Sequence, residues 1–70
     1  MSVYVDARGL SCPQPVILAR KAIDAGQFPI EVRVETVTSR ENVRRMAEKQ
    51  GCTVTVETEG DEFVLTLTKE

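Results

Sequence analysis

The amino-acid sequence predicts an α/β fold in which two helices cover one face of a four-stranded mixed sheet. Apolar residues recur at helical spacing between residues 13 and 25 and again between residues 38 and 51. Apolar and polar residues alternate, as in half-buried strands, over four other stretches: 2–6, 30–35, 52–57 and 63–68. Because each expected strand has a single apolar face, both helices should pack on that face. The chain is therefore expected to form a two-layer sandwich in the order β-α-β-α-β-β.

The first strand and first helix are predicted from a change of periodicity. Val3 and Val5 form the apolar face of a strand that ends at Asp6. The helix that follows collects its apolar residues on one side, and these are Val16, Leu18, Ala19, Ala22 and Ile23. Gly26 is suited to end this helix. A strand, helix and strand joined by short connections imply a right-handed crossover and a parallel strand pair.

The second half of the chain is predicted from capping and turn signals. Thr38 and Glu41 have the spacing of a capping box, which places the start of the second helix at Thr38. The narrow apolar stripe of that helix consists of Val43, Met46 and Ala47. Cys52 falls on the apolar face of the third strand and should be part of the core. Residues 59–61 predict a tight hairpin turn into the fourth strand.

The length and composition are those of a single globular domain covering residues 1–70. Hydrophobic residues make up 41% of the sequence and charged residues 29%, which is ordinary for a soluble domain. No apolar run approaches the length of a membrane span, and the first residues lack the pattern of a signal peptide. We therefore expect a cytoplasmic protein with no membrane contact.

The cysteine and histidine counts exclude several kinds of site. The sequence contains two cysteines, Cys12 and Cys52, and no histidine. Catalytic systems that pair a serine or cysteine with histidine are therefore excluded, and two distant thiols do not form a typical tetrahedral zinc site. We expect neither a metal nor a cofactor. If Cys12 is a nucleophile, backbone dipoles and nearby cations must activate it, which suits sulfur transfer because a thiolate needs no general base.

Cys12 is expected at the position that precedes the first helix. Pro13 suits the first helical position, because its fixed φ is already helical, and Pro15 is tolerated in the first turn. The two prolines should stiffen the helix start. Unpaired N–H groups and the positive end of the helix dipole there would favour a thiolate, or a persulfide, on Cys12.

Three residues before Cys12 complete the expected supporting turn. The guanidinium of Arg8 could lower the pKa of the thiol further, whereas Asp6 would oppose this effect if it came near. Gly9, together with the prolines, indicates a specific rigid turn. The alternative is that Cys12 is merely a small packed hydrophobe, as many free cysteines are.

Candidate contacts for a partner lie in the basic part of the chain. Residues 1–50 carry eight Lys and Arg against six Asp and Glu, whereas residues 51–70 carry one against five. Ile17 falls among the polar residues of the first helix about one turn after Cys12, and Arg20 lies on its polar side. Arg40 and Arg44 share a helix face at i and i+4, where they could bind an anion or be solvated. The alternative is an ordinary surface of mixed charge.

The segment Asp6-Ala-Arg-Gly-Leu-Ser-Cys12-Pro13-Gln-Pro15, followed by an amphipathic helix, closely resembles the signature of the TusA/SirA-like small sulfur carriers. The hallmark of that family is Cys-Pro-x-Pro, and the resemblance covers nearly the whole chain. Residues 39–43 are more similar to the amino-terminal domain of the YedF-like members, which are linked to selenium metabolism and usually carry a second, DsrE-like domain. The chain has Glu35-Thr36-Val37 where TusA proteins have Asp-Asp-Pro.

The resemblance implies the same fold and a sulfur carrier or sulfurtransferase activity. Cys12 would receive a persulfide from a donor such as a cysteine desulfurase and pass it to an acceptor sulfurtransferase, for tRNA thiolation or for sulfur or selenium metabolism.

Two other functions remain open at this level. The chain could be a regulatory or binding module with a protein or RNA partner and a redox-sensitive Cys12. The three aromatic residues, Tyr4, Phe28 and Phe63, are scattered, which argues against direct RNA binding. A thiol-disulfide oxidoreductase would need a resolving cysteine, but Cys52 is forty residues from Cys12 and is expected to be buried.

Overall fold

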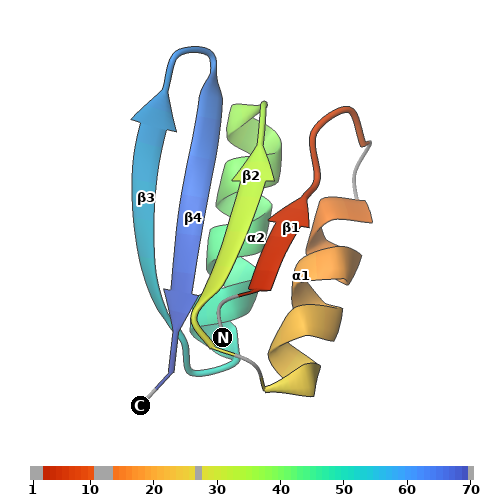
Figure 1. Ribbon diagram of the computed structural model, residues 1–70, viewed down its shortest axis with the longest axis vertical. Coiled ribbons are helices and arrows are strands. Elements are labelled where there is room, and N and C mark those ends of the chain that lie inside the picture. The colour runs from red at the N-terminus through yellow and green to blue at the C-terminus, as the bar shows by residue number, and fades with distance from the viewer. Residues whose placement is uncertain (1–2, 11–13, 27, 70) are drawn as a thin grey trace.

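Two helices pack on one face of a four-stranded sheet in the computed structural model (Figure 1), which describes residues 3–10, 14–26 and 28–69. The elements follow one another as β1 (Val3–Asp6), α1 (Gln14–Ala25), β2 (Ile30–Val34), α2 (Val37–Lys49), β3 (Thr53–Glu59) and β4 (Glu62–Thr68). This confirms the predicted two-layer sandwich and its order of elements.

The strands are arranged in the order β1-β2-β4-β3. β1 and β2 are parallel, as the crossover through α1 requires, and Val5 lies opposite Val32. β4 is antiparallel to both of its neighbours, β2 and β3. The carboxyl ends of β1 and β2 and the β3–β4 turn therefore lie at the same end of the sheet, at the top of Figure 1.

The core lies between the sheet and the two helices. Among the described residues, the hydrophobic side chains with no exposed surface are Ala19, Ile30, Val32, Val34, Val43, Ala47, Leu65 and Leu67. They come from α1, α2 and the two central strands, so the apolar faces predicted for these elements do meet in one layer. Removal of this apolar surface from water is the main term that holds the two layers together.

The start of α2 differs from the prediction. Thr36 is the N-cap residue, with an extended backbone (φ −124°, ψ 152°), and its side chain accepts a hydrogen bond from the Ser39 N–H at 3.0 Å. The predicted capping box between Thr38 and Glu41 is therefore wrong. Thr38 is already inside the helix, and the Glu41 carboxylate pairs instead with arginines of α2. β2 ends at Val34, so the chain turns into α2 earlier than the Thr38 signal indicates.

The third strand is less buried than its alternating pattern predicts. Val54 is half-buried and Val56 is 36% exposed, because β3 is an edge strand of the sheet. Cys52 immediately precedes β3 and is buried, and its N–H donates a hydrogen bond to the Ala47 carbonyl at 3.0 Å. The prediction that Cys52 belongs to the core is confirmed.

The β3–β4 hairpin has a two-residue turn. Glu59 lies opposite Glu62, so Gly60 and Asp61 form the connection, as expected. Gly60 has φ +62°, which is a left-handed conformation that glycine adopts without a steric penalty. This turn places Glu62 at the end of the sheet where β1 also ends.

A matched pair of substitutions in α2 tests where the core lies. Val43→Ala should lower the free energy of unfolding by about 1.5–3 kcal/mol, because the side chain of Val43 is fully buried. Val37→Ala is the control, because Val37 lies on the same helix and is 55% exposed. It should change stability by less than about 0.7 kcal/mol. Urea denaturation measures both, and equal losses would contradict the described packing.

The observed cap can be separated from the predicted one. Thr36→Ala should destabilise the protein by about 1 kcal/mol, because the Ser39 N–H loses its acceptor. Thr38→Ala should not destabilise it, because alanine is favourable inside a helix. Thermal or urea unfolding of the two variants decides the matter. A larger loss for Thr38→Ala would favour the capping box that the sequence indicated.

Candidate functional site

Cys12 and Pro13 lie outside the residues that the structure describes, so the predictions made for them stay predictions. The structure describes the chain on both sides of them. Residues 7–10 follow β1 as a turn, and α1 begins at Gln14. Pro15, in the first turn of α1, is fully buried. A proline is tolerated here because a residue in the first turn has no intrahelical partner for its N–H. The burial of Pro15 holds the start of α1 in place.

Asp6 and Arg8 form a clamp at the base of this turn. The Arg8 backbone N–H donates to Asp6 Oδ1 at 3.1 Å. The Arg8 guanidinium also donates to both carboxylate oxygens of Asp6, each at 2.9 Å. Such two-point pairing of guanidinium and carboxylate restricts the orientation of both groups. The clamp therefore holds the first residues of the turn against the end of β1.

The clamp continues across the sheet through Glu62. Arg8 Nη1 lies 3.2 Å from Glu62 Oε2, and Arg33 Nη1 lies 2.9 Å from Glu62 Oε1. Glu62 therefore links the turn after β1 to the start of β4 and to the central strand β2. Arg33 Nη2 also lies 3.6 Å from Glu59 Oε1, so two guanidinium groups face three carboxylates in this cluster. The positive charge of Arg8 is shared with Asp6 and Glu62, so its expected effect on the Cys12 thiol stays untested.

The electrostatics of the cluster follow from these contacts. Hydrogen bonds from the Arg8 side chain and backbone lower the pKa of Asp6 from its usual 3.8 to about 2. Hydrogen bonds from Arg33 and Arg8 lower the pKa of Glu62. The same pairs raise the pKa of Arg8, chiefly through Asp6, and that of Arg33, chiefly through Glu62. All four groups are therefore charged at neutral pH.

Gly9 is held by a residue that the sequence reasoning did not select. Its N–H donates a hydrogen bond to Glu35 Oε1, and its φ of +75° is in the left-handed region that favours glycine. Glu35 follows β2, so this bond joins the turn after β1 to the neighbouring strand. In the sequence, Glu35 stands out only because it departs from the family pattern. The structure shows that it anchors the turn before Cys12.

An apolar hollow of about 420 Å³ lies beside this turn. Its lining residues come from the chain on both sides of residues 11–13, and they are Leu10, Gln14, Ile17 and Leu18. Ile17 is 47% exposed, which confirms its expected position on the outer side of α1. The hollow is therefore available to an apolar side chain of another molecule.

Arg40 and Arg44 flank Glu41 on α2. Arg40 lies 3.2 Å from Glu41 and stacks over the Phe63 ring, with its guanidinium carbon 4.7 Å from the ring centroid. Arg44 contacts Glu41 at 2.7 Å and Glu48 at 3.0 Å. The same contacts lower the pKa of Glu41, chiefly through Arg44. An anion binding to this arginine pair would have to compete with carboxylates that are already in place.

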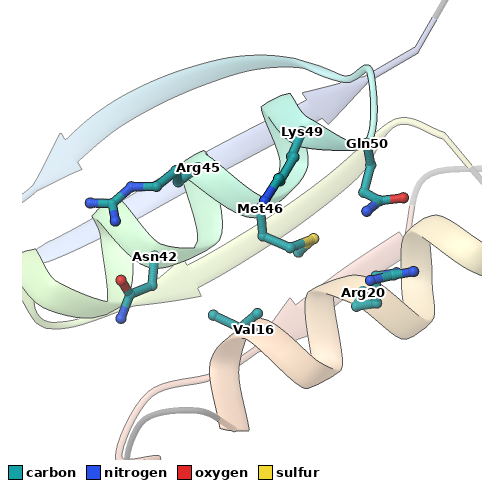
Figure 2. Close-up of a pocket in the computed structure, with 7 residues that line it drawn as sticks. All are labelled: Val16, Arg20, Asn42, Arg45, Met46, Lys49 and Gln50. Atoms are coloured by element: carbon teal, nitrogen blue, oxygen red, sulfur yellow. The ribbon is translucent and has the colours of Figure 1, made fainter.

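Arg20 lies apart from Arg40 and Arg44, in a groove between the two helices (Figure 2). This interhelical groove has a volume of about 440 Å³ and is lined by Val16, Arg20, Asn42, Arg45, Met46, Lys49 and Gln50. Sequence reasoning selected Arg20 but missed the residues of α2 that face it. Their helical spacing placed them on one side of α2, but nothing in the sequence showed which helix they would face.

The described residues contain no group of three or more His, Cys, Asp or Glu side chains that could hold a metal ion. No helix among them is long and apolar enough to span a membrane.

The Asp6–Arg8 clamp makes a prediction about pH. Asp6 should titrate with a pKa of about 2, and Arg8→Gln should return it towards 3.8. Because the folded-state pKa is depressed, the stabilisation is fully present above 3.8 and is lost as the pH falls towards 2. Carboxyl-carbon NMR measures the titration. Arg20→Gln is the control, since Arg20 pairs with Asp24 and should leave Asp6 unchanged. An unshifted Asp6 in the wild-type protein would contradict the clamp.

Comparison with known proteins is consistent with this architecture. The family described as sulfurtransferase TusA matches residues 3–69. A SirA-like protein of known crystal structure from Desulfitobacterium hafniense is 32% identical, with a TM-score of 0.82 and full coverage of both chains. No curated protein matches the sequence. The chain belongs to the TusA family of sulfurtransferases.

Proposed function

We propose that the protein is a sulfur carrier that holds a persulfide on Cys12. The observation that carries this proposal is the match to the TusA family over residues 3–69, a range that includes Cys12 within its Cys-Pro-x-Pro motif. The donor would be a persulfide-bearing protein such as a cysteine desulfurase, and the acceptor a second sulfurtransferase. A reducing compartment such as the cytoplasm suits this role, because thiols there stay reduced.

The transfer needs no external oxidant or reductant. The Cys12 thiolate attacks the outer sulfur of the donor persulfide, and a new S–S bond forms as the S–S bond of the donor breaks. The electron pair of the broken bond leaves with the donor thiolate, and the outer sulfur keeps its proton. Delivery repeats the step in the opposite sense, with an acceptor thiolate attacking the outer sulfur and Cys12 leaving as thiolate. Selenium could be carried by the same exchange.

The described residues support this chemistry because they hold the chain on both sides of Cys12. The Gly9–Glu35 hydrogen bond and the Asp6–Arg8 clamp fix the chain before Cys12, and the buried Pro15 fixes the helix after it. A sulfur anion near the start of α1 would be stabilised by first-turn N–H groups. This stabilisation replaces the general base, because the sequence contains no histidine. A low thiol pKa would also make Cys12 a good leaving group during delivery.

The apolar hollow offers a contact for the protein that exchanges sulfur with Cys12. Leu10 and Ile17 are both exposed there, one before and one after the reactive cysteine in the sequence. An apolar side chain of a donor or acceptor would be held close to the turn by this surface. Burial of such a side chain would contribute about 1.5–3 kcal/mol to the encounter.

Mass spectrometry tests the proposal directly. After incubation with a cysteine desulfurase and cysteine, the wild-type protein should gain the mass of one sulfur atom, and Cys12→Ser should not. Cys52→Ala is the matched control and should still gain it, because Cys52 is only 7% exposed. Absence of the addition on the wild type, or an equal addition on Cys12→Ser, would refute the carrier role. Either of these two results would favour a regulatory or binding module instead.

A further inference from the structure

The interhelical groove gathers three cations, and two of them have no carboxylate partner among the described residues. Of the described residues, those that line it include the three cations Arg20, Arg45 and Lys49 and no acidic side chain. Arg20 has only a long pair with Asp24, at 3.5 Å, in which both side chains are more than half exposed. Among the described residues, Arg45 and Lys49 have no carboxylate within 4.0 Å.

Four other arginines of the described residues differ from Arg45, because each is paired with a carboxylate. Arg8, Arg33, Arg40 and Arg44 each have a carboxylate within 3.2 Å. Arg45 and Lys49 are instead spaced i and i+4 on α2, where two like charges destabilise a helix slightly. Lys49 lies in the last turn of α2, where the helix dipole favours a cation, but neither side chain has a carboxylate partner among the described residues. A negatively charged group from another molecule would supply one.

The floor of the groove is apolar. Met46 extends from α2 towards α1, where Val16 lies below it (Figure 2). Both side chains are partly buried against the core. Methionine is flexible and polarizable, so it adapts to side chains of different shape. A groove of about 440 Å³ with this floor and a basic rim fits an apolar side chain flanked by carboxylates.

A protein segment fits these features better than RNA does. The lining residues that the structure describes include no aromatic side chain on which a base could stack. The net negative charge of the whole chain also opposes a long polyanion. An acidic segment needs only local charge complementarity, which the three cations provide.

We propose that the interhelical groove binds an acidic, partly apolar segment of a partner protein. Carboxylates of that segment pair with Arg45 and Lys49, and an apolar side chain packs on Val16 and Met46. Assigning the segment to a donor or acceptor of sulfur rests on the proposed function. Val16 is four residues after Cys12 in the sequence and belongs to α1. A partner bound in the groove therefore lies along the helix that follows Cys12 in the chain.

Binding is tested with a defined probe, the capped peptide Asp-Leu-Glu-Glu-Leu-Asp. Its neutral counterpart, Asn-Leu-Gln-Gln-Leu-Asn, and a single-stranded RNA oligonucleotide are compared with it. In NMR titrations of the full chain, the acidic peptide should shift the amide signals of Val16, Arg20 and residues 45–50, and the neutral peptide should not. Added salt should weaken the effect, because exposed charges are screened over about 10 Å at 0.1 M. Signals that shift elsewhere, or stronger binding of RNA in the groove, would overturn the proposal.

A matched pair of variants separates the groove from total charge. The double variant Arg45→Gln with Lys49→Gln removes two positive charges from the groove and should weaken peptide binding about two- to thirtyfold. The double variant Lys21→Gln with Lys69→Gln removes the same charge outside the groove and should bind like the wild type. Equal loss in both variants, or no loss in the first, would refute the assignment to the groove.

The docking site in the groove and the sulfur-carrier role of Cys12 are tested by separate measurements. Inorganic polysulfide should load Cys12 equally well in the wild type and in the Arg45→Gln, Lys49→Gln variant, as measured by mass. Cys12→Ser should still bind the acidic peptide. Peptide binding without sulfur loading of the wild type would refute the carrier role and keep the docking site. Sulfur loading without peptide binding would keep the carrier role and refute the docking site.

Discussion

The parallel pairing of β1 with β2 determines where the candidate site forms. Because α1 crosses between these strands, their carboxyl ends lie side by side, with Asp6 opposite Arg33. Glu35 then follows β2 at the place where its carboxylate accepts the Gly9 N–H. The antiparallel neighbour β4 brings Glu62 to the same end of the sheet, where it reaches Arg8. The turn before Cys12 is thus held by two segments that are distant in the sequence.

This anchoring bears on how a cysteine could be activated without histidine. Arg8 is four residues from Cys12, but its guanidinium is shared between Asp6 and Glu62. Its charge serves to hold the turn, and the low pKa of Asp6 is the consequence. Within the described residues, the start of α1 then remains the nearest source of positive potential along the chain. The fully buried Pro15 lies in the first turn of α1.

Arginines paired with carboxylates and cations without such partners lie on different surfaces of the molecule. The arginines at the open face of the sheet and at the start of α2 pair with neighbouring carboxylates. These pairs hold the side chains in place, and their opposite charges largely cancel. In the groove between the helices, Arg45 and Lys49 have no carboxylate within 4.0 Å among the described residues, and Arg20 has only its 3.5 Å pair with Asp24. The two surfaces therefore suit different tasks, because paired charges rigidify a turn whereas unpaired ones attract a partner.

The sequence by itself determined the six elements, the two-layer packing and the family, because apolar periodicity and the Cys-Pro-x-Pro motif are local patterns. Local signals failed where two neighbouring residues were chemically equivalent, as with Thr36 and Thr38 at the start of α2. Only the tertiary structure decided the strand order, the anchoring of Gly9 by Glu35 and of Arg8 by Glu62, and the position of Arg20, Arg45 and Lys49 around one groove. The Arg8–Glu62 contact spans 54 residues. Such contacts depend on strand register and on how the helices pack, which no periodicity within one element encodes.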